Sequence, residues 1–235
     1  MASDHEPAPA QCSAATTSEL NNLLQIISGT VSLIEDLCSG TDVAKPYFAM
    51  IHESIERAKG VTAKFTGEAG GATEKVRLHP ELSARRQAKA ALPTIRSKPS
   101  IIIVDDEPMA AMLMKRTLTN SGFRVSTVRS GFECLDLLRR RPRDFDMFIV
   151  DLTMPFMDGE ETFERIRDIN PNVPVVIATG FIEHQQLDRL LSVGLAAFLH
   201  KPYSPDELLS CVNSVLASSN LLRQGSSSGG LAVSY

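Results

Sequence analysis

Five polar side chains in the C-terminal half of the chain each follow an apolar run of strand length. Asp105 and Asp106 follow the first run, Asp151 the third, Thr179 the fourth and Lys201 the fifth. In an open α/β sheet the carboxyl ends of parallel strands meet at one edge, where ligands bind. We therefore expect these side chains to share one rim.

This combination of groups predicts a particular chemistry. Three crowded carboxylates repel one another, which raises their pKa values unless they share a cation. Hard oxygen ligands without histidine or cysteine favour Mg²⁺ over transition metals. A divalent ion beside a carboxylate, an ammonium and a hydroxyl suits phosphoryl transfer. A carboxylate nucleophile would then form an aspartyl phosphate.

Strand-like and helix-like segments alternate along the same half, which predicts a doubly wound parallel sheet with helices on both faces. The expected strands are Ile101–Val104, Arg124–Val128, Met147–Val150, Pro174–Ala178 and Ala196–Leu199. The expected helices are Pro108–Asn120, Phe132–Arg140, Glu160–Ile169, His184–Ser192 and Pro205–Ala217. The second strand is the least apolar, so we expect it at an edge of the sheet.

Asp105-Asp106, the run from Asp151 to Gly159, Thr179 and Lys201-Pro202 together resemble the receiver domain of two-component response regulators. The resemblance covers about 115 residues and implies a flavodoxin-like α/β fold with five parallel strands in the order 2-1-3-4-5. It implies that Asp151 is the phosphoacceptor. The other implied roles are Mg²⁺ ligation by Asp105, Asp106, Asp151 and the backbone carbonyl of Thr153, and phosphoryl contacts from Lys201 and Thr179.

The resemblance also implies a switch at two positions. Thr179 would move toward the phosphoryl group, and Phe198 would turn inward to fill the vacated space. An ordinary core position is the alternative interpretation of Phe198. The peptide bond before Pro202 is expected to be cis. Phe181 is unusually bulky beside such a site, and we expect it to slow water entry.

Two amphipathic stripes in the N-terminal half predict an antiparallel helical hairpin over residues 15–68. The first stripe runs from Leu20 to Cys38 and the second from Phe48 to Phe65. A lone hairpin cannot enclose its apolar faces. Pairing with a second copy into a four-helix bundle is therefore expected, and docking against the chain's own second half is the alternative.

The hairpin resembles the dimerisation and phosphotransfer hairpin of sensor histidine kinases. The resemblance rests on Ser18-Glu-Leu-Asn-Asn and on Ile51-His-Glu-Ser-Ile-Glu-Arg-Ala58. That family carries a phosphorylatable histidine where this chain has Ser18, and a serine hydroxyl is a poor nucleophile without a positioned base. A degenerate kinase hairpin is therefore implied. His52 is interpreted as an exposed surface histidine, not a substitute phosphoacceptor.

Composition narrows the class of protein. The 235 residues are 43% hydrophobic and 22% charged, which is typical of a globular protein. The net charge of −4 falls on residues 101–235, so we expect no nucleic-acid partner. No apolar run is long enough to span a membrane. Four scattered cysteines indicate reduced thiols, so we expect a cytoplasmic protein.

The expected organisation is a disordered tail at 1–14, the hairpin at 15–68, a linker at 69–98, a receiver at 99–218 and a flexible tail at 219–235. The linker includes a helical stretch around Glu81–Ala91. The sequence predicts a phosphorelay signalling protein and not an enzyme. No nucleotide-binding segment is recognised, so no kinase activity of its own is expected. Its partners would be a histidine kinase or phosphotransfer protein and a second copy. The alternative function is an adaptor or phosphate sink that binds kinases through its hairpin.

Overall fold

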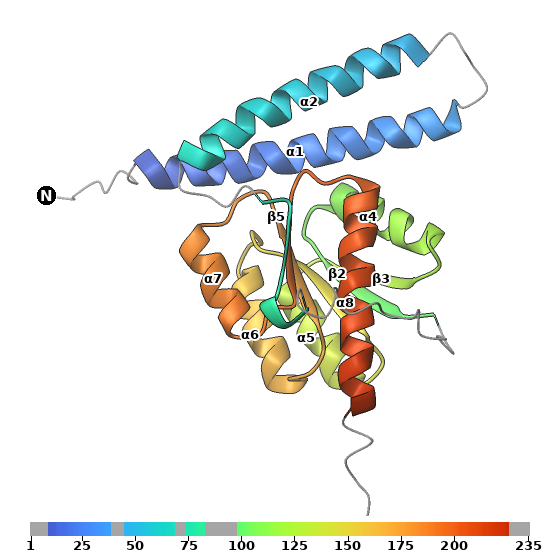
Figure 1. Ribbon diagram of the computed structural model, residues 1–235, viewed down its shortest axis with the longest axis vertical. Coiled ribbons are helices and arrows are strands. Elements are labelled where there is room, and N and C mark those ends of the chain that lie inside the picture. The colour runs from blue at the N-terminus through green and yellow to red at the C-terminus, as the bar shows by residue number, and fades with distance from the viewer. Residues whose placement is uncertain (1–8, 39–44, 69–73, 83–97, 226–235) are drawn as a thin grey trace, which may run out of the picture.

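The computed structural model describes residues 9–38, 45–68, 74–82 and 98–225. A helical hairpin lies across one end of an α/β domain (Figure 1). The hairpin consists of α1 (Pro9–Leu37) and α2 (Lys45–Glu68). Leu24 and Val31 of α1 are buried, as is Ile55 of α2. These positions belong to the two predicted apolar stripes, so the antiparallel hairpin is confirmed.

The α/β domain is built on one six-stranded sheet with the order β1-β6-β5-β4-β2-β3. The strands are β1 (Val76–Leu78), β2 (Ser100–Val104), β3 (Arg124–Val128), β4 (Met147–Asp151), β5 (Val175–Thr179) and β6 (Ala197–His200). Strands β2 to β6 are parallel and reproduce the predicted order 2-1-3-4-5. The fold class is therefore confirmed.

The strand count of five is wrong, because β1 adds an antiparallel edge strand beside β6. Val76 pairs with Leu199 and Leu78 with Ala197, inside the segment predicted to be a linker. Three half-buried residues are too few to show an alternating pattern, so tertiary pairing decides this strand. A helical stretch begins at residues 80–82, and the rest of the predicted Glu81–Ala91 helix lies outside the described residues.

Helices cover both faces of the sheet (Figure 1). One face packs against α5 (Gly131–Arg140), α6 (Gly159–Ile169) and α7 (His184–Ser192). The other face packs against α4 (Pro108–Asn120) and α8 (Pro205–Gly225). The strand side chains alternate between these two cores, as expected for a sheet buried on both sides.

Two helices extend beyond their predicted limits. Helix α1 begins at Pro9, inside the segment predicted to be a disordered tail, and α8 continues to Gly225, inside the predicted flexible tail. Residues 1–8 and 226–235 of those tails lie outside the described residues. Within the described part of the chain, no helix is both long and apolar enough to cross a bilayer.

The hairpin lies on the carboxyl-end rim of its own sheet, which was the alternative to pairing with a second copy. Asn21 of α1 donates a hydrogen bond to the backbone carbonyl of Gly180, and Gln25 accepts one from the backbone N–H of Tyr203. Two polar side chains of the hairpin therefore have hydrogen-bond partners within the same chain. Pairing with a second copy remains a prediction.

Candidate phosphoryl-transfer site at the carboxyl-end rim

The predicted acidic residues come together at the end of the sheet. One carboxylate oxygen from each of Asp105, Asp106 and Asp151 lies within 4.8 Å of the others. Asp105 follows β2, and Asp151 is the last residue of β4. Because β2 and β4 are parallel neighbours in the sheet, their ends place the two acids side by side.

A local turn fixes the orientation of Asp151. The backbone N–H of Gly159 donates to the carbonyl of Leu152 at 2.9 Å, which folds the loop after β4 back onto the strand end. A Cβ at Gly159 would overlap the backbone carbonyl of Asp151, so only glycine allows this approach. Asp158 then caps α6 by accepting from the N–H of Glu161 at 2.8 Å.

Lys201 supplies the positive charge at the site. Its ammonium lies 3.0 Å from Oδ2 of Asp105 and 3.2 Å from Oδ1 of Asp151, and all three side chains are almost fully buried. Burial alone would lower the pKa of Lys201, but the carboxylates of Asp151 and Asp105 outweigh it and raise the pKa. Lys201 is therefore charged at neutral pH. The Lys201–Pro202 bond is cis, as predicted.

Asp151 and Asp106 have raised pKa values. Burial is the main cause of the rise in the pKa of Asp151 to about 7, and the charges of Asp105 and Asp106 add to it, while Lys201 opposes it. Burial, followed by the charge of Asp105, also raises the pKa of Asp106. Three ionised carboxylates and one ammonium leave two uncompensated negative charges. A divalent cation fits this set of hard oxygen donors in charge and in chemistry.

Thr179 ends β5 beside this cluster and is fully buried. Its hydroxyl donates to the backbone carbonyl of Phe181 at 3.2 Å. This bond is longer than is usual for a hydroxyl donor, so it is a weak one.

Phe198 and Phe181 are both enclosed. The Phe198 ring is fully buried in the core on the α5–α7 face of the sheet, which agrees with the interpretation as a core aromatic and places the ring inward. Phe181 is 9% exposed. His52 is a surface residue as predicted, and its Nε2 lies 3.0 Å from a carboxylate oxygen of Glu35.

Residues 101–213 match the family model for the response regulator receiver domain. The transcriptional regulatory protein ZraR of Klebsiella oxytoca is 31% identical over 121 residues, covering 52% of this chain and 27% of ZraR. Residues 101–213 form a response regulator receiver domain. The sensor protein EvgS of Escherichia coli K12 is 32% identical over 156 residues, covering 66% of this chain and 12% of EvgS.

The structural comparison agrees with this assignment. A CheY-like response regulator receiver domain protein from Methanospirillum hungatei superposes with a TM-score of 0.50 at 25% identity, covering 54% of this chain and 99% of that one. The receiver therefore belongs to two-component phosphorelay signalling. This chain spans about a quarter of ZraR and a smaller share of EvgS.

Sequence reasoning missed the residues that bring α1 onto the receiver. Ser18 of the predicted degenerate position is 5% exposed, and its hydroxyl lies 3.4 Å from that of Thr153. The missed signal is a second stripe on α1, made of small polar side chains at spacings of three and four. Its members are Ser18, Asn21, Gln25, Ser28 and Ser32. Such a stripe beside an apolar one indicates a helix that is covered on two sides.

Proposed function

We propose that this protein accepts a phosphoryl group on Asp151 from a histidine kinase or a histidine phosphotransfer protein. The observation that carries the proposal is the buried cluster of Asp105, Asp106, Asp151 and Lys201 within a receiver fold. The carboxylate of Asp151 attacks phosphorus, the donor's P–N bond breaks, and the imidazole nitrogen keeps the electron pair and takes up a proton. The product is an acyl phosphate on Asp151.

Each neighbouring residue has a role in this transfer. Asp105, Asp106, Asp151 and the backbone carbonyl of Thr153 would hold Mg²⁺, which supplies positive charge against the phosphoryl oxygens. Lys201 pairs with a phosphoryl oxygen in place of one of its present carboxylate partners. Thr179 exchanges its bond to Phe181 for one to the phosphoryl group. The chain needs no nucleotide site for this step, because the donor supplies the high-energy bond.

The hairpin is proposed as the element that responds, and as a dimer interface. Several large apolar side chains stay exposed on α1 and α2 although the hairpin already lies on the receiver. They are Leu20, Leu23, Ile27 and Ile34 of α1 and Met50, Ile51 and Val61 of α2. Leu24, Ile27, Met50, Ile51 and Ile55 also line an open apolar groove between the helices. Two such hairpins from two copies would cover these surfaces in a four-helix bundle.

The same apolar surface favours a second candidate function. A hairpin of a histidine kinase, instead of a second copy, would make this protein an adaptor or phosphate sink. Mixing the protein with a full histidine kinase and analysing the complex by native mass spectrometry separates the two. Heterodimers would favour the adaptor, and unmixed homodimers would favour the phosphoacceptor switch.

Acetyl phosphate with Mg²⁺ tests the proposed chemistry. The wild-type protein is expected to gain the mass of one phosphoryl group in intact mass spectrometry, and Asp151→Asn is expected to gain none. Asp144→Asn is the matched control, because Asp144 is exposed and lies away from the rim. Equal labelling of Asp151→Asn and the wild type would contradict the assignment of Asp151.

A further inference from the structure

The candidate nucleophile is closed to solvent in this structure. Asp151 is 3% exposed and Asp105 is 1% exposed. The polar stripe of α1 lies over the same rim, and its members Asn21 and Gln25 are themselves buried. A donor molecule has to bring phosphorus into line with the carboxylate oxygen of Asp151. The docked hairpin and a docked protein donor therefore need the same surface.

Helix α1 contacts the loops that follow three neighbouring strands. Ser18 lies against Thr153 in the loop after β4. The side-chain amide of Asn21 donates to the carbonyl of Gly180, directly after β5, at 2.6 Å. These two loops begin directly after Asp151 and Thr179. Helix α1 therefore contacts both the segment of the candidate phosphoacceptor and that of the candidate switch residue.

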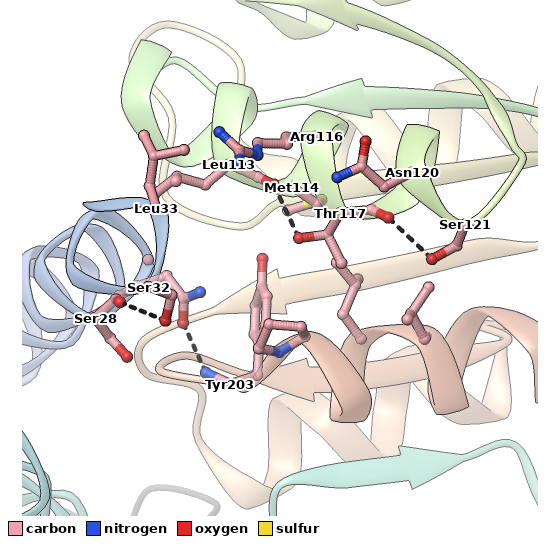
Figure 2. A pocket seen from close by; sticks show the side chains of 15 residues that line it. Ser28, Ser32, Leu33, Leu113, Met114, Arg116, Thr117, Asn120, Ser121 and Tyr203 are labelled. Carbon is pink, nitrogen blue, oxygen red and sulfur yellow. Dashed lines mark hydrogen bonds between the residues drawn. The ribbon is translucent and has the colours of Figure 1, made fainter. Parts of the chain in front are cut away.

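The third contact lies after β6. The side-chain oxygen of Gln25 accepts a hydrogen bond of 2.6 Å from the backbone N–H of Tyr203, two residues beyond Lys201. Farther along, α1 faces α4 across a pocket of about 280 Å³. Figure 2 shows Ser28, Ser32 and Leu33 on one side of this pocket and Leu113 and Tyr203 on the other. The first members of the polar stripe thus contact the rim, and its last members, Ser28 and Ser32, face α4.

The docking is specific and includes polar contacts at several points. A Cβ at Gly180 would lie 2.6 Å from the backbone oxygen of Ser18 and 2.8 Å from the Cβ of Asn21, so glycine is needed for this approach. The side-chain oxygen of Asn22, next along α1, is buried without a hydrogen-bond partner in the described part of the chain. An unsatisfied polar atom costs free energy that water would relieve on undocking. The contact is therefore suited to reversible release.

We propose that the rim binds one helix at a time, either α1 of the same chain or the helix of a protein phosphodonor. The donor that fits carries an imidazole where α1 carries Ser18, above the loop that follows Asp151. Phosphoryl transfer then proceeds only from the undocked state, which lowers the observed rate by the fraction of molecules that are undocked. This inference rests on the proposed phosphoacceptor function of Asp151.

Asn21→Ala tests the inference in the full-length protein. Alanine removes the bond to Gly180 and favours the helix, so α1 stays folded while its docking weakens. The loss of one hydrogen bond is expected to speed phosphorylation by acetyl phosphate with Mg²⁺ by about fivefold. The same variant should speed hydrogen exchange at the Tyr203 amide by about fivefold, because that amide is covered by Gln25 and not by Asn21. Glu19→Ala, an exposed site on α1, is the matched control.

Each outcome decides between specific alternatives. Faster exchange and faster phosphorylation in Asn21→Ala alone support the inference. Faster exchange at an unchanged phosphorylation rate overturns it, because α1 then leaves the rim without limiting transfer. Unchanged exchange and an unchanged rate overturn it as well, while the proposed function stands. No phosphorylation in any variant overturns the proposed function, and the gating role with it.

Discussion

Asn21 and Gly180 are joined by a 2.6 Å hydrogen bond between a side chain of the first helix and the backbone that leaves β5. Gly180 directly follows Thr179, whose hydroxyl is bonded to Phe181 on the other side of Gly180. The candidate switch residue and the hairpin thus meet at adjacent positions of one loop. A rearrangement of Thr179 would therefore change the contact between Gly180 and α1 directly.

Gly180→Ala is predicted to force the hairpin away from the rim. The new methyl group would meet backbone at Ser18, which cannot move aside as the end of a side chain can. We expect a loss of about 1–3 kcal/mol in the free energy of unfolding, measured by urea denaturation. Gly60→Ala is the control, because nothing lies within 4 Å of a Cβ there. In the interior of α2 this change should be neutral or stabilising by up to about 1 kcal/mol. Equal stability of Gly180→Ala and the wild type would contradict the close contact.

Mg²⁺ is predicted to stabilise the folded protein through the acidic cluster. A cation that binds only the folded state adds about 2.7 kcal/mol when its concentration is 100 times its Kd. The melting temperature should therefore rise with Mg²⁺ and fall again with a chelator. Asp106→Asn is expected to remove most of this rise, because it removes one of the three charges. Asp158→Asn keeps a side chain that caps α6 and should retain the rise. A rise that persists in Asp106→Asn would place the cation elsewhere.

His200 is predicted to make stability depend on pH. Burial is the main cause that lowers the pKa of His200 to about 4, and Lys75 adds to it. An unfolded histidine titrates near 6.5. Above that pH His200 is neutral in both the folded and the unfolded protein, so its titration does not lower the free energy of unfolding. Between 6.5 and about 4 only the unfolded state binds the proton, so this contribution is lost as the pH falls, by up to about 3 kcal/mol.

His200→Phe isolates this effect. Both ring nitrogens of His200 are buried without hydrogen-bond partners in the described structure, so an apolar ring of similar shape should be tolerated at neutral pH. The free energy of unfolding, measured in urea from pH 7 to pH 4, should fall less steeply in the variant than in the wild type. Parallel curves would show that His200 is not neutral when folded.

The sequence was sufficient to predict the rim because each of its residues follows an apolar strand. Asp151, Thr179 and Lys201 were expected together, and the structure brings them together. Their roles stay predictions. The strand Val76–Leu78 was missed because its hydrogen bonds come from the exposed edge of β6, which no local pattern records.

The placement of the hairpin was not predictable for a related reason. Its apolar stripe is compatible with a second copy and with the receiver, and the residues that decide between them are polar. Asn21 and Gln25 bond to main-chain groups of distant loops, and any residue type in those loops offers such groups. The polar stripe of α1 therefore indicates a second covered side of the helix, but only the three-dimensional arrangement of the loops shows what covers it.

The apolar surface that remains on the hairpin predicts a dimer. Leu23 is 50% exposed and Ile27 is 48% exposed, one turn apart on the same helix. In a four-helix bundle both would be buried, and each would contribute about half of the roughly 1.5–3 kcal/mol that burial of a fully exposed side chain supplies. The double variant Leu23→Glu/Ile27→Glu should therefore be monomeric in light scattering at concentrations where the wild type is dimeric. Its contacts with the receiver should persist, because neither residue belongs to the polar stripe. Phe132→Glu, an exposed apolar site on α5, is the matched control and should leave the mass unchanged. A wild-type protein that is monomeric at every concentration would contradict the predicted dimer.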